Sequence, residues 1–232
     1  MAQAYIEIGT LMQTAGLPVR LQFGEVGWWF QAGGSPPSMA FYDADTAAAA
    51  ATALGRALAT FAGSGQRSIG QCVCGCEFPA RAAGGYVAAV EATVLAALPG
   101  ALFEVLWPLD VNDPATAPLC RYVNLPPAWE TRSGSGFDTF LAEALSYSGV
   151  LYDLNKALVC AGYPFQALSW DMAHCRYLME WFDPCSPWAM DYLNALGTGV
   201  PLIKAWAWDH LNLYGWPLPL PVWGRWSRRT AG

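Results

Sequence analysis

The segment Trp216-Pro-Leu-Pro-Leu-Pro-Val-Trp223 restricts the fold of this chain more than any other feature. Proline has a fixed φ and no backbone N–H, so a proline at every second residue excludes a regular helix and a central strand. An extended conformation remains, which must lie over the protein's own core or against a neighbouring molecule. We favour a neighbouring molecule, because proline-rich extended segments lose little entropy when they dock.

Tryptophan is concentrated in the same part of the chain. Of the 12 tryptophans, eight lie after residue 165, at positions 170, 181, 188, 206, 208, 216, 223 and 226. A tryptophan buries a large apolar area and carries one N–H donor, which suits protein cores, interfaces and the walls of sugar-binding clefts. Core packing is the ordinary role of any single tryptophan. The residues that we expect at an interface are Trp206, Trp208, Trp216, Trp223 and Trp226, followed by the basic end Arg225, Arg228 and Arg229.

Composition narrows the class of protein. The 232 residues are 54% hydrophobic and 13% charged, which excludes disorder. A net charge of −6 argues against nucleic acid as a partner, because phosphate binding needs clustered Lys and Arg. We expect no transmembrane segment, because no span of about 18 apolar residues lacks a charge or a proline. The N-terminus has no signal-peptide pattern, so we expect synthesis in the cytoplasm without secretion.

Apolar periodicity predicts an α+β fold whose N-terminal half, residues 1–110, is an α/β unit with a mixed sheet and two helices. Alternation predicts a strand pair at Ala4–Ile8 and Val19–Phe23, which opens this half. The further elements expected here are short strands at 28–30 and 39–42, a helix at 46–62, a strand at 68–78, a helix at 86–98 and a strand at 101–109.

The second half should be mainly helical and rich in Trp and Pro. A connector rich in proline and glycine, residues 111–136, precedes a helical half over 137–213 and an extended arm over 214–232, and all parts should pack as one unit. Within the helical half we expect helices at 137–160, capped by Ser135, at 169–182 and at 188–196, and a short helix or a buried strand at 203–213.

Three cysteines form the most unusual local pattern. Cys72, Cys74 and Cys76 would share one face of a strand, and thiolates are ligands for zinc and iron–sulfur clusters. Side chains two residues apart on a strand are roughly 6.6 Å apart, which is too wide for one tetrahedral zinc. Cys175 and Cys185, near His174, form a second weak metal signal. We expect buried free thiols without a metal or cofactor, and a structural metal or iron–sulfur centre is the alternative.

Acidic residues stand beside aromatic residues several times in the C-terminal half. Asp171 follows Trp170, Glu180 precedes Trp181, and Asp209 follows Trp208. Two carboxyl groups about 5 to 9.5 Å apart, with aromatic walls, are what a glycosidase needs, and these three acids would supply them. Ordinary helix caps and ion pairs explain the same acids more simply.

These patterns favour a structural or assembly subunit of a large complex over an enzyme, and the specific expectation is a virion component such as a phage tail or baseplate protein. Its partners would be other protein subunits, docked on the aromatic and proline-rich C-terminal surface. A carbohydrate-active protein is the alternative.

Overall fold

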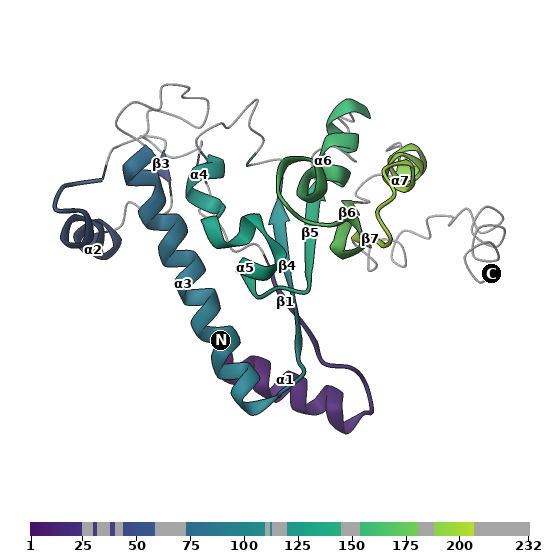
Figure 1. Ribbon diagram of the computed structural model, residues 1–232, viewed down its shortest axis with the longest axis horizontal. Coiled ribbons are helices and arrows are strands. Elements are labelled where there is room, and N and C mark those ends of the chain that lie inside the picture. The colour runs from purple at the N-terminus through teal and green to yellow at the C-terminus, as the bar shows by residue number, and fades with distance from the viewer. Residues whose placement is uncertain are drawn as a thin grey trace.

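A five-stranded parallel sheet with strand order β1-β4-β5-β6-β7 forms the centre of the molecule in the computed structural model (Figure 1). Residues 1–24, 30–31, 38–39, 44–58, 73–109, 112, 120–144, 154–180 and 188–206 are described. The strands are β1 (Arg20–Phe23), β4 (Leu102–Pro108), β5 (Thr139–Ala144), β6 (Cys175–Glu180) and β7 (Ile203–Trp206). Because their order in space equals their order in the chain, the sheet is wound in one direction only.

Helices connect the strands and cover one face of the sheet. The longer ones are α1 (Ala2–Thr14), α2 (Ala44–Leu54), α3 (Val73–Ala97), α6 (Leu154–Ala167) and α7 (Trp188–Gly197). The short elements are α4 (Cys120–Asn124), η1 (Pro127–Glu130), α5 (Arg132–Ser135), η2 (Met172–His174) and a two-stranded antiparallel sheet of β2 (Phe30–Gln31) and β3 (Ser38–Met39). In Figure 1, α1 lies against the carboxyl-terminal end of α3.

Alternate strand residues divide between two faces. Phe103, Val105 and Trp107 of β4 enter the main hydrophobic core, beneath the helices. Trp107 is fully buried at its centre, stacks on Tyr163 with ring centroids 5.0 Å apart, and donates its indole N–H to the Asn124 carbonyl at 3.0 Å. This partner removes the penalty of burying the N–H group.

The sheet is curled, and its second face is concave. Lys204 of β7 forms an ion pair with Glu104 of β4, although β5 and β6 separate their strands. In a flat sheet, three strand spacings of about 4.8 Å would hold the two backbones roughly 14 Å apart. The ion pair therefore joins strands that curling has brought together across the concave face.

The expected α+β division is wrong, because the parallel sheet continues through the C-terminal half. Residues within the expected helices 137–160 and 169–182 form β5 and β6. Both strands have apolar residues on both faces, so their alternation is weak, as is usual in parallel sheets. The expected helix end at residue 160 is also wrong, because α6 continues through Pro164 to Ala167. The helix expected at 188–196 is confirmed as α7, and 203–206 form a strand.

Two elements of the N-terminal half are also corrected. Residues 4–8 belong to helix α1, where Tyr5, Ile6 and Met12 pack on the core around the buried Gly9 with helical spacing. A Cβ at Gly9 would lie 2.4 Å from a Leu98 methyl carbon, so glycine lets α1 approach closely. Residues 73–78 begin α3 and are not a strand.

Several other expectations hold. The strands at 19–23 and 101–109 are confirmed as β1 and β4, which pair in parallel. The helices at 46–62 and 86–98 are confirmed in part by α2 and α3. Helix α3 begins earlier than expected, since Gly84 and Gly85 lie inside it, where a Cβ at Gly84 would be 2.8 Å from the Cβ of Pro126. The arm 214–232 lies outside the described residues, and the domain boundaries stay a prediction.

One buried carboxyl group makes the fold sensitive to pH. Glu91 of α3 is 6% exposed, and its Oε1 has no hydrogen-bond partner among the described residues. Burial, assisted by the nearby charge of Asp138, raises the pKa of Glu91 from 4.5 to about 7. Gly136 has φ +80°, which favours glycine, and a Cβ there would lie 2.8 Å from Glu91 Oε2, so the carboxyl group would have to shift.

We expect Glu91→Gln to stabilise the protein at alkaline pH. A raised pKa means that the folded state holds the proton more tightly, so this contribution to stability is complete below pH 4.5 and is lost as pH rises through about 7. The shift corresponds to roughly 3 kcal/mol at most. Urea unfolding at pH 5 and pH 8 should show that the variant loses less stability between the two values than the wild type does. An equal loss of stability between pH 5 and pH 8 in both proteins would contradict this explanation. The control is Glu7→Gln, which changes an exposed glutamate of α1.

Candidate functional site

The concave face of the sheet holds two neighbouring cavities that share Gln22 and Lys204 in their walls. The first, of about 400 Å³, lies toward the amino ends of the strands and is lined by charged and polar residues. The second, of about 370 Å³, lies toward the carboxyl ends and is lined mainly by apolar residues. Each strand contributes to this face through the residues that alternate with its core positions.

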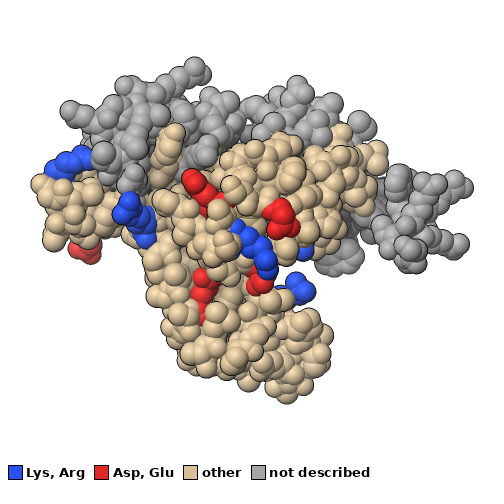
Figure 2. Space-filling model, in the orientation of Figure 1, with Lys and Arg blue, Asp and Glu red and all other residues tan. Residues whose placement is uncertain are grey.

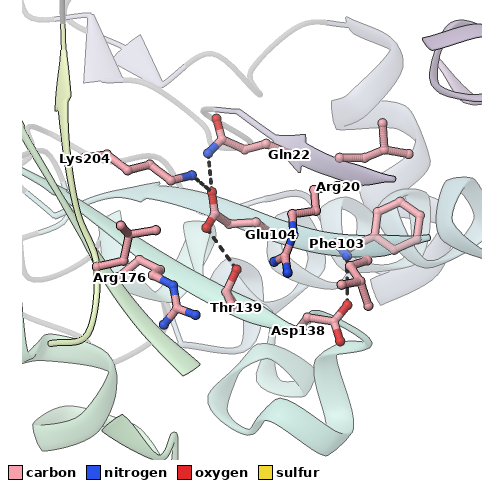
Figure 3. Close-up of a pocket in the computed structure, with 11 residues that line it drawn as sticks. Arg20, Gln22, Phe103, Glu104, Asp138, Thr139, Arg176 and Lys204 are labelled. Atoms are coloured by element: carbon pink, nitrogen blue, oxygen red, sulfur yellow. Dashed lines mark hydrogen bonds and ion pairs between the residues drawn. The ribbon is translucent and has the colours of Figure 1, made fainter. Parts of the chain in front are cut away.

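Glu104 is the central residue of the charged cavity (Figure 3). Its Oε1 accepts a hydrogen bond from Gln22 Nε2 at 2.5 Å and forms the ion pair with Lys204, and its Oε2 accepts from Thr139 Oγ1 at 2.9 Å. The Glu104 side chain is 13% exposed. Its carboxylate therefore has a donor from each of β1, β5 and β7, which offsets the cost of burying a charge.

Further charged groups surround this network. In Figure 3, Arg20 and Arg176 lie on either side of the Glu104–Thr139 pair, and Asp138 lies at the lower edge. Asp138 Oδ2 accepts a hydrogen bond from the Phe103 N–H at 2.9 Å. Figure 2 shows that charged side chains are sparse on the visible face of the molecule and gather near its middle.

The second cavity combines an acid with an aromatic wall. Leu106, Leu141 and Leu178 form a small buried cluster at its floor. Glu143 of β5 is 3% exposed and lines the cavity, and Trp206 of β7 lines it while remaining 46% exposed. A buried carboxyl group beside an exposed indole in a cavity is an arrangement that can contact a sugar ring.

The three acids proposed as a catalytic set are not all brought together. Asp171 precedes β6, is exposed, and lies 2.6 Å from His174 Nδ1 through its Oδ1; this hydrogen bond lowers the pKa of Asp171. Glu180 is the last residue of β6, so the two acids lie at opposite ends of a strand that is about 17 Å long. Asp209 lies outside the described residues. Asp171 and Glu180 thus cannot act on one glycosidic bond.

The cysteines expected to share one face of a strand do not lie on a strand where they are described. Cys74 and Cys76 lie in helix α3, which does not place residues two apart on one face, and Cys72 and Cys185 lie outside the described residues. Cys175 is buried in the core, and burial raises the pKa of its thiol to about 11. The thiolate needed for metal binding is thereby disfavoured. The described residues contain no group of three or more His, Cys, Asp or Glu suited to a metal ion.

Tryptophans divide between core and surface. Trp107, Trp129 and Trp170 are buried, and the indole N–H of Trp170 donates to the Trp129 carbonyl at 2.8 Å. Trp206 is the expected interface residue that falls in the described part of the chain, and it is exposed. The other expected interface residues lie outside the described residues; they are Trp208, Trp216, Trp223, Trp226, Arg225, Arg228 and Arg229.

Five residues of the concave face were not expected from the sequence, namely Glu104, Glu143, Arg20, Arg176 and Lys204. The usable signal was a charged residue next to buried apolar residues of a strand: Glu104 of β4 stands between the buried Phe103 and Val105, and Glu143 of β5 follows the buried Ala142. A charge at such a position indicates that the second face of the strand is not ordinary core.

No protein family matches the chain, and neither does any curated protein or solved structure. Within the described residues, none of the helices has the length and apolar character needed to cross a membrane. The function is therefore inferred from the geometry of the concave face and of the surface around it.

We expect Lys204→Met to destabilise the protein by about 1–3 kcal/mol, because Glu104 would keep its charge without its cationic partner. The double variant Glu104→Gln/Lys204→Met should recover roughly 1 kcal/mol, since the neutral amide needs no ion pair. Urea denaturation measures both. Arg20→Met is the matched control on the same face, and we expect it to change stability by less than about 0.5 kcal/mol. A double variant less stable than Lys204→Met would contradict the role given to the pair.

Proposed function

We propose that the protein is a structural subunit of a larger protein assembly, and that a virion tail or baseplate is the specific setting. The observation that carries the proposal is the position of Trp206, an indole 46% exposed at the end of an edge strand. A large aromatic side chain in such a position is typical of the centre of a protein interface. It also leads directly into the segment that contains Trp208, Trp216 and Trp223.

The edges of the sheet support docking of a further chain. Among the described residues, β1 pairs only with β4, and β7 pairs only with β6. An edge strand has unpaired N–H and C=O groups along one side, and proteins usually cover or charge such an edge. In β7, Ala205 and Trp206 are exposed and uncharged, so this edge is suited to contact with another protein.

Exposed apolar side chains on α1 and the turn after it offer a second contact area. Ile8 is 49% exposed and Leu11 is 70% exposed, and they stand three residues apart on one side of the helix. Leu17 follows in the turn and is 56% exposed. Adjacent exposed aliphatic residues on a chain with few charges favour burial in an assembly.

The proposal predicts that the protein co-sediments with particles far larger than one chain when it is expressed with a tag in its natural host. Trp206→Ala combined with removal of residues 207–232 should shift it to the monomer fraction of a sucrose gradient, because both parts of the proposed surface are lost. Recovery of the intact protein as a free monomer in every fraction would contradict the proposal. Far-UV circular dichroism of the variant checks that it still folds, and Leu95→Ala on the exposed side of α3 is the control.

A carbohydrate-active site is the second candidate, and the apolar cavity supports it. Glu143 pairs in register with Leu178, and Glu180 comes two residues after Leu178 on the neighbouring strand. Glu180 in turn pairs with Trp206. Two acids near the carboxyl ends of adjacent parallel strands occupy the part of a sheet where α/β enzymes place catalytic groups. The revised acid set is therefore Glu143 and Glu180.

The glycan candidate predicts measurable oligosaccharide binding that quenches tryptophan fluorescence. Trp206→Phe should weaken binding by about tenfold, since the indole would supply the stacking surface. Glu143→Gln and Glu180→Gln should retain binding and abolish hydrolysis. A panel of oligosaccharides that leaves the fluorescence of the wild type unchanged would remove this candidate, without bearing on the assembly proposal.

A further inference from the structure

The charged cavity of about 400 Å³ holds more positive than negative side chains. Three cations, Arg20, Arg176 and Lys204, and two carboxylates, Glu104 and Asp138, line it. This excess is local, since the whole chain carries a net charge of −6. A positive cavity on an acidic protein attracts anions selectively.

Both carboxylates in the cavity are already satisfied by the protein. Glu104 has its three donors on neighbouring strands, and one of them is the ammonium group of Lys204. Asp138 accepts from the Phe103 N–H, and its other oxygen lies 3.7 Å from Arg132 Nη2. Neither acid is therefore the natural partner of Arg20 or Arg176.

Arg176 is held in place by neutral groups. Its Nη1 donates to the carbonyls of Ala173 at 2.8 Å and Cys175 at 2.7 Å. These bonds orient the guanidinium without cancelling its charge, and within the described residues they involve only one of its three nitrogens. An arginine fixed through one nitrogen keeps donors for bidentate contact with an oxyanion.

Arg20 supplies a second guanidinium to the same cavity. It is exposed at the start of β1 and forms no hydrogen bond or ion pair with any described residue. In Figure 3 it reaches toward the cavity from the side opposite Arg176. Because no described residue holds Arg20, its side chain is available to pair with a ligand that Arg176 has oriented.

We propose that this cavity is a binding site for a small organic anion, whose carboxylate or phosphate group pairs with Arg176 and Arg20. The volume exceeds what a bare inorganic ion fills and falls within the range of small-molecule sites. Leu102 and Leu202 in the wall provide apolar contact for the body of the ligand. Anion binding here does not rest on the assembly role proposed for Trp206.

Isothermal titration calorimetry with glycerol 3-phosphate and with citrate tests the site, and glycerol is the uncharged control. The full chain should bind at least one of the two anions with one site per chain, and added salt should weaken binding. Binding of glycerol 3-phosphate alone identifies a phosphate site, and binding of citrate alone identifies a carboxylate site. Binding of both shows that the site recognises the oxyanion chemistry that the two ligands share. Failure of both anions to bind would overturn the proposal.

Three variants locate the binding. Arg176→Gln and Arg20→Gln should each weaken it about tenfold or more, because each removes a charge-assisted contact. Arg56→Gln, which removes the same charge from the exposed turn after α2, should leave binding unchanged. Equal affinity in all three variants would place the anion elsewhere and overturn the proposal. Because Arg20 is exposed and makes no described contact, its substitution reports binding even if Arg176→Gln impairs folding.

Discussion

The hydrogen bonds and ion pair of Glu104 join four strands of the curled sheet that carries both cavities. A single, largely covered carboxylate receives donors from β1, β5 and β7 and lies itself on β4, so it connects four of the five strands. A charge with three donors is favourable only while all of them converge. The curled form satisfies this condition, and a flat sheet would separate Lys204 from Glu104.

Curling also explains why the two faces differ in character. On the convex face, helices cover the strands, and the core there is aromatic, with Phe23, Phe103, Phe137 and Phe140 arranged around Trp107 and Trp129. On the concave face, the described residues form a charged part toward the amino ends and an apolar part toward the carboxyl ends. Parallel sheets usually bury both faces, so a second face with charges and cavities is a place where function can be sought.

Sequence reasoning succeeded where an element has one buried side. Helix α7 and the carboxyl-terminal part of α3 follow an ordinary helical stripe, with Val87, Val90 and Val94 buried at helical spacing. It failed where both sides are buried, as in β5 and β6, because the period of two then disappears. The expected start of the helix at 86 was also too late, because Gly84 lies inside α3, where a close approach to Pro126 favours glycine.

The site was harder to predict than the fold for a related reason. Trp206 could be singled out because a tryptophan-rich ending is visible in the sequence alone. Glu104 and Lys204 are 100 residues apart, and nothing local marks them as a pair. The parallel register places Gln22, Glu104 and Thr139 at matched positions of three strands. Curling of the sheet then brings Lys204 of β7 to Glu104.

The two parts of the concave face place different demands on a ligand. At the amino ends, backbone carbonyls fix the guanidinium of Arg176 before any ligand binds. The charged cavity is therefore preorganised for an anion, which reduces the entropy lost on binding. At the carboxyl ends, Trp206 is half exposed on an edge strand, and the area that it offers becomes fully buried only against a large partner. Lys204 and Gln22 each line both cavities and bind Glu104, so occupation of one part would act on the other through these two side chains. A docked subunit that moved Lys204 would release charge on Glu104, weakening the positive field in which an anion binds.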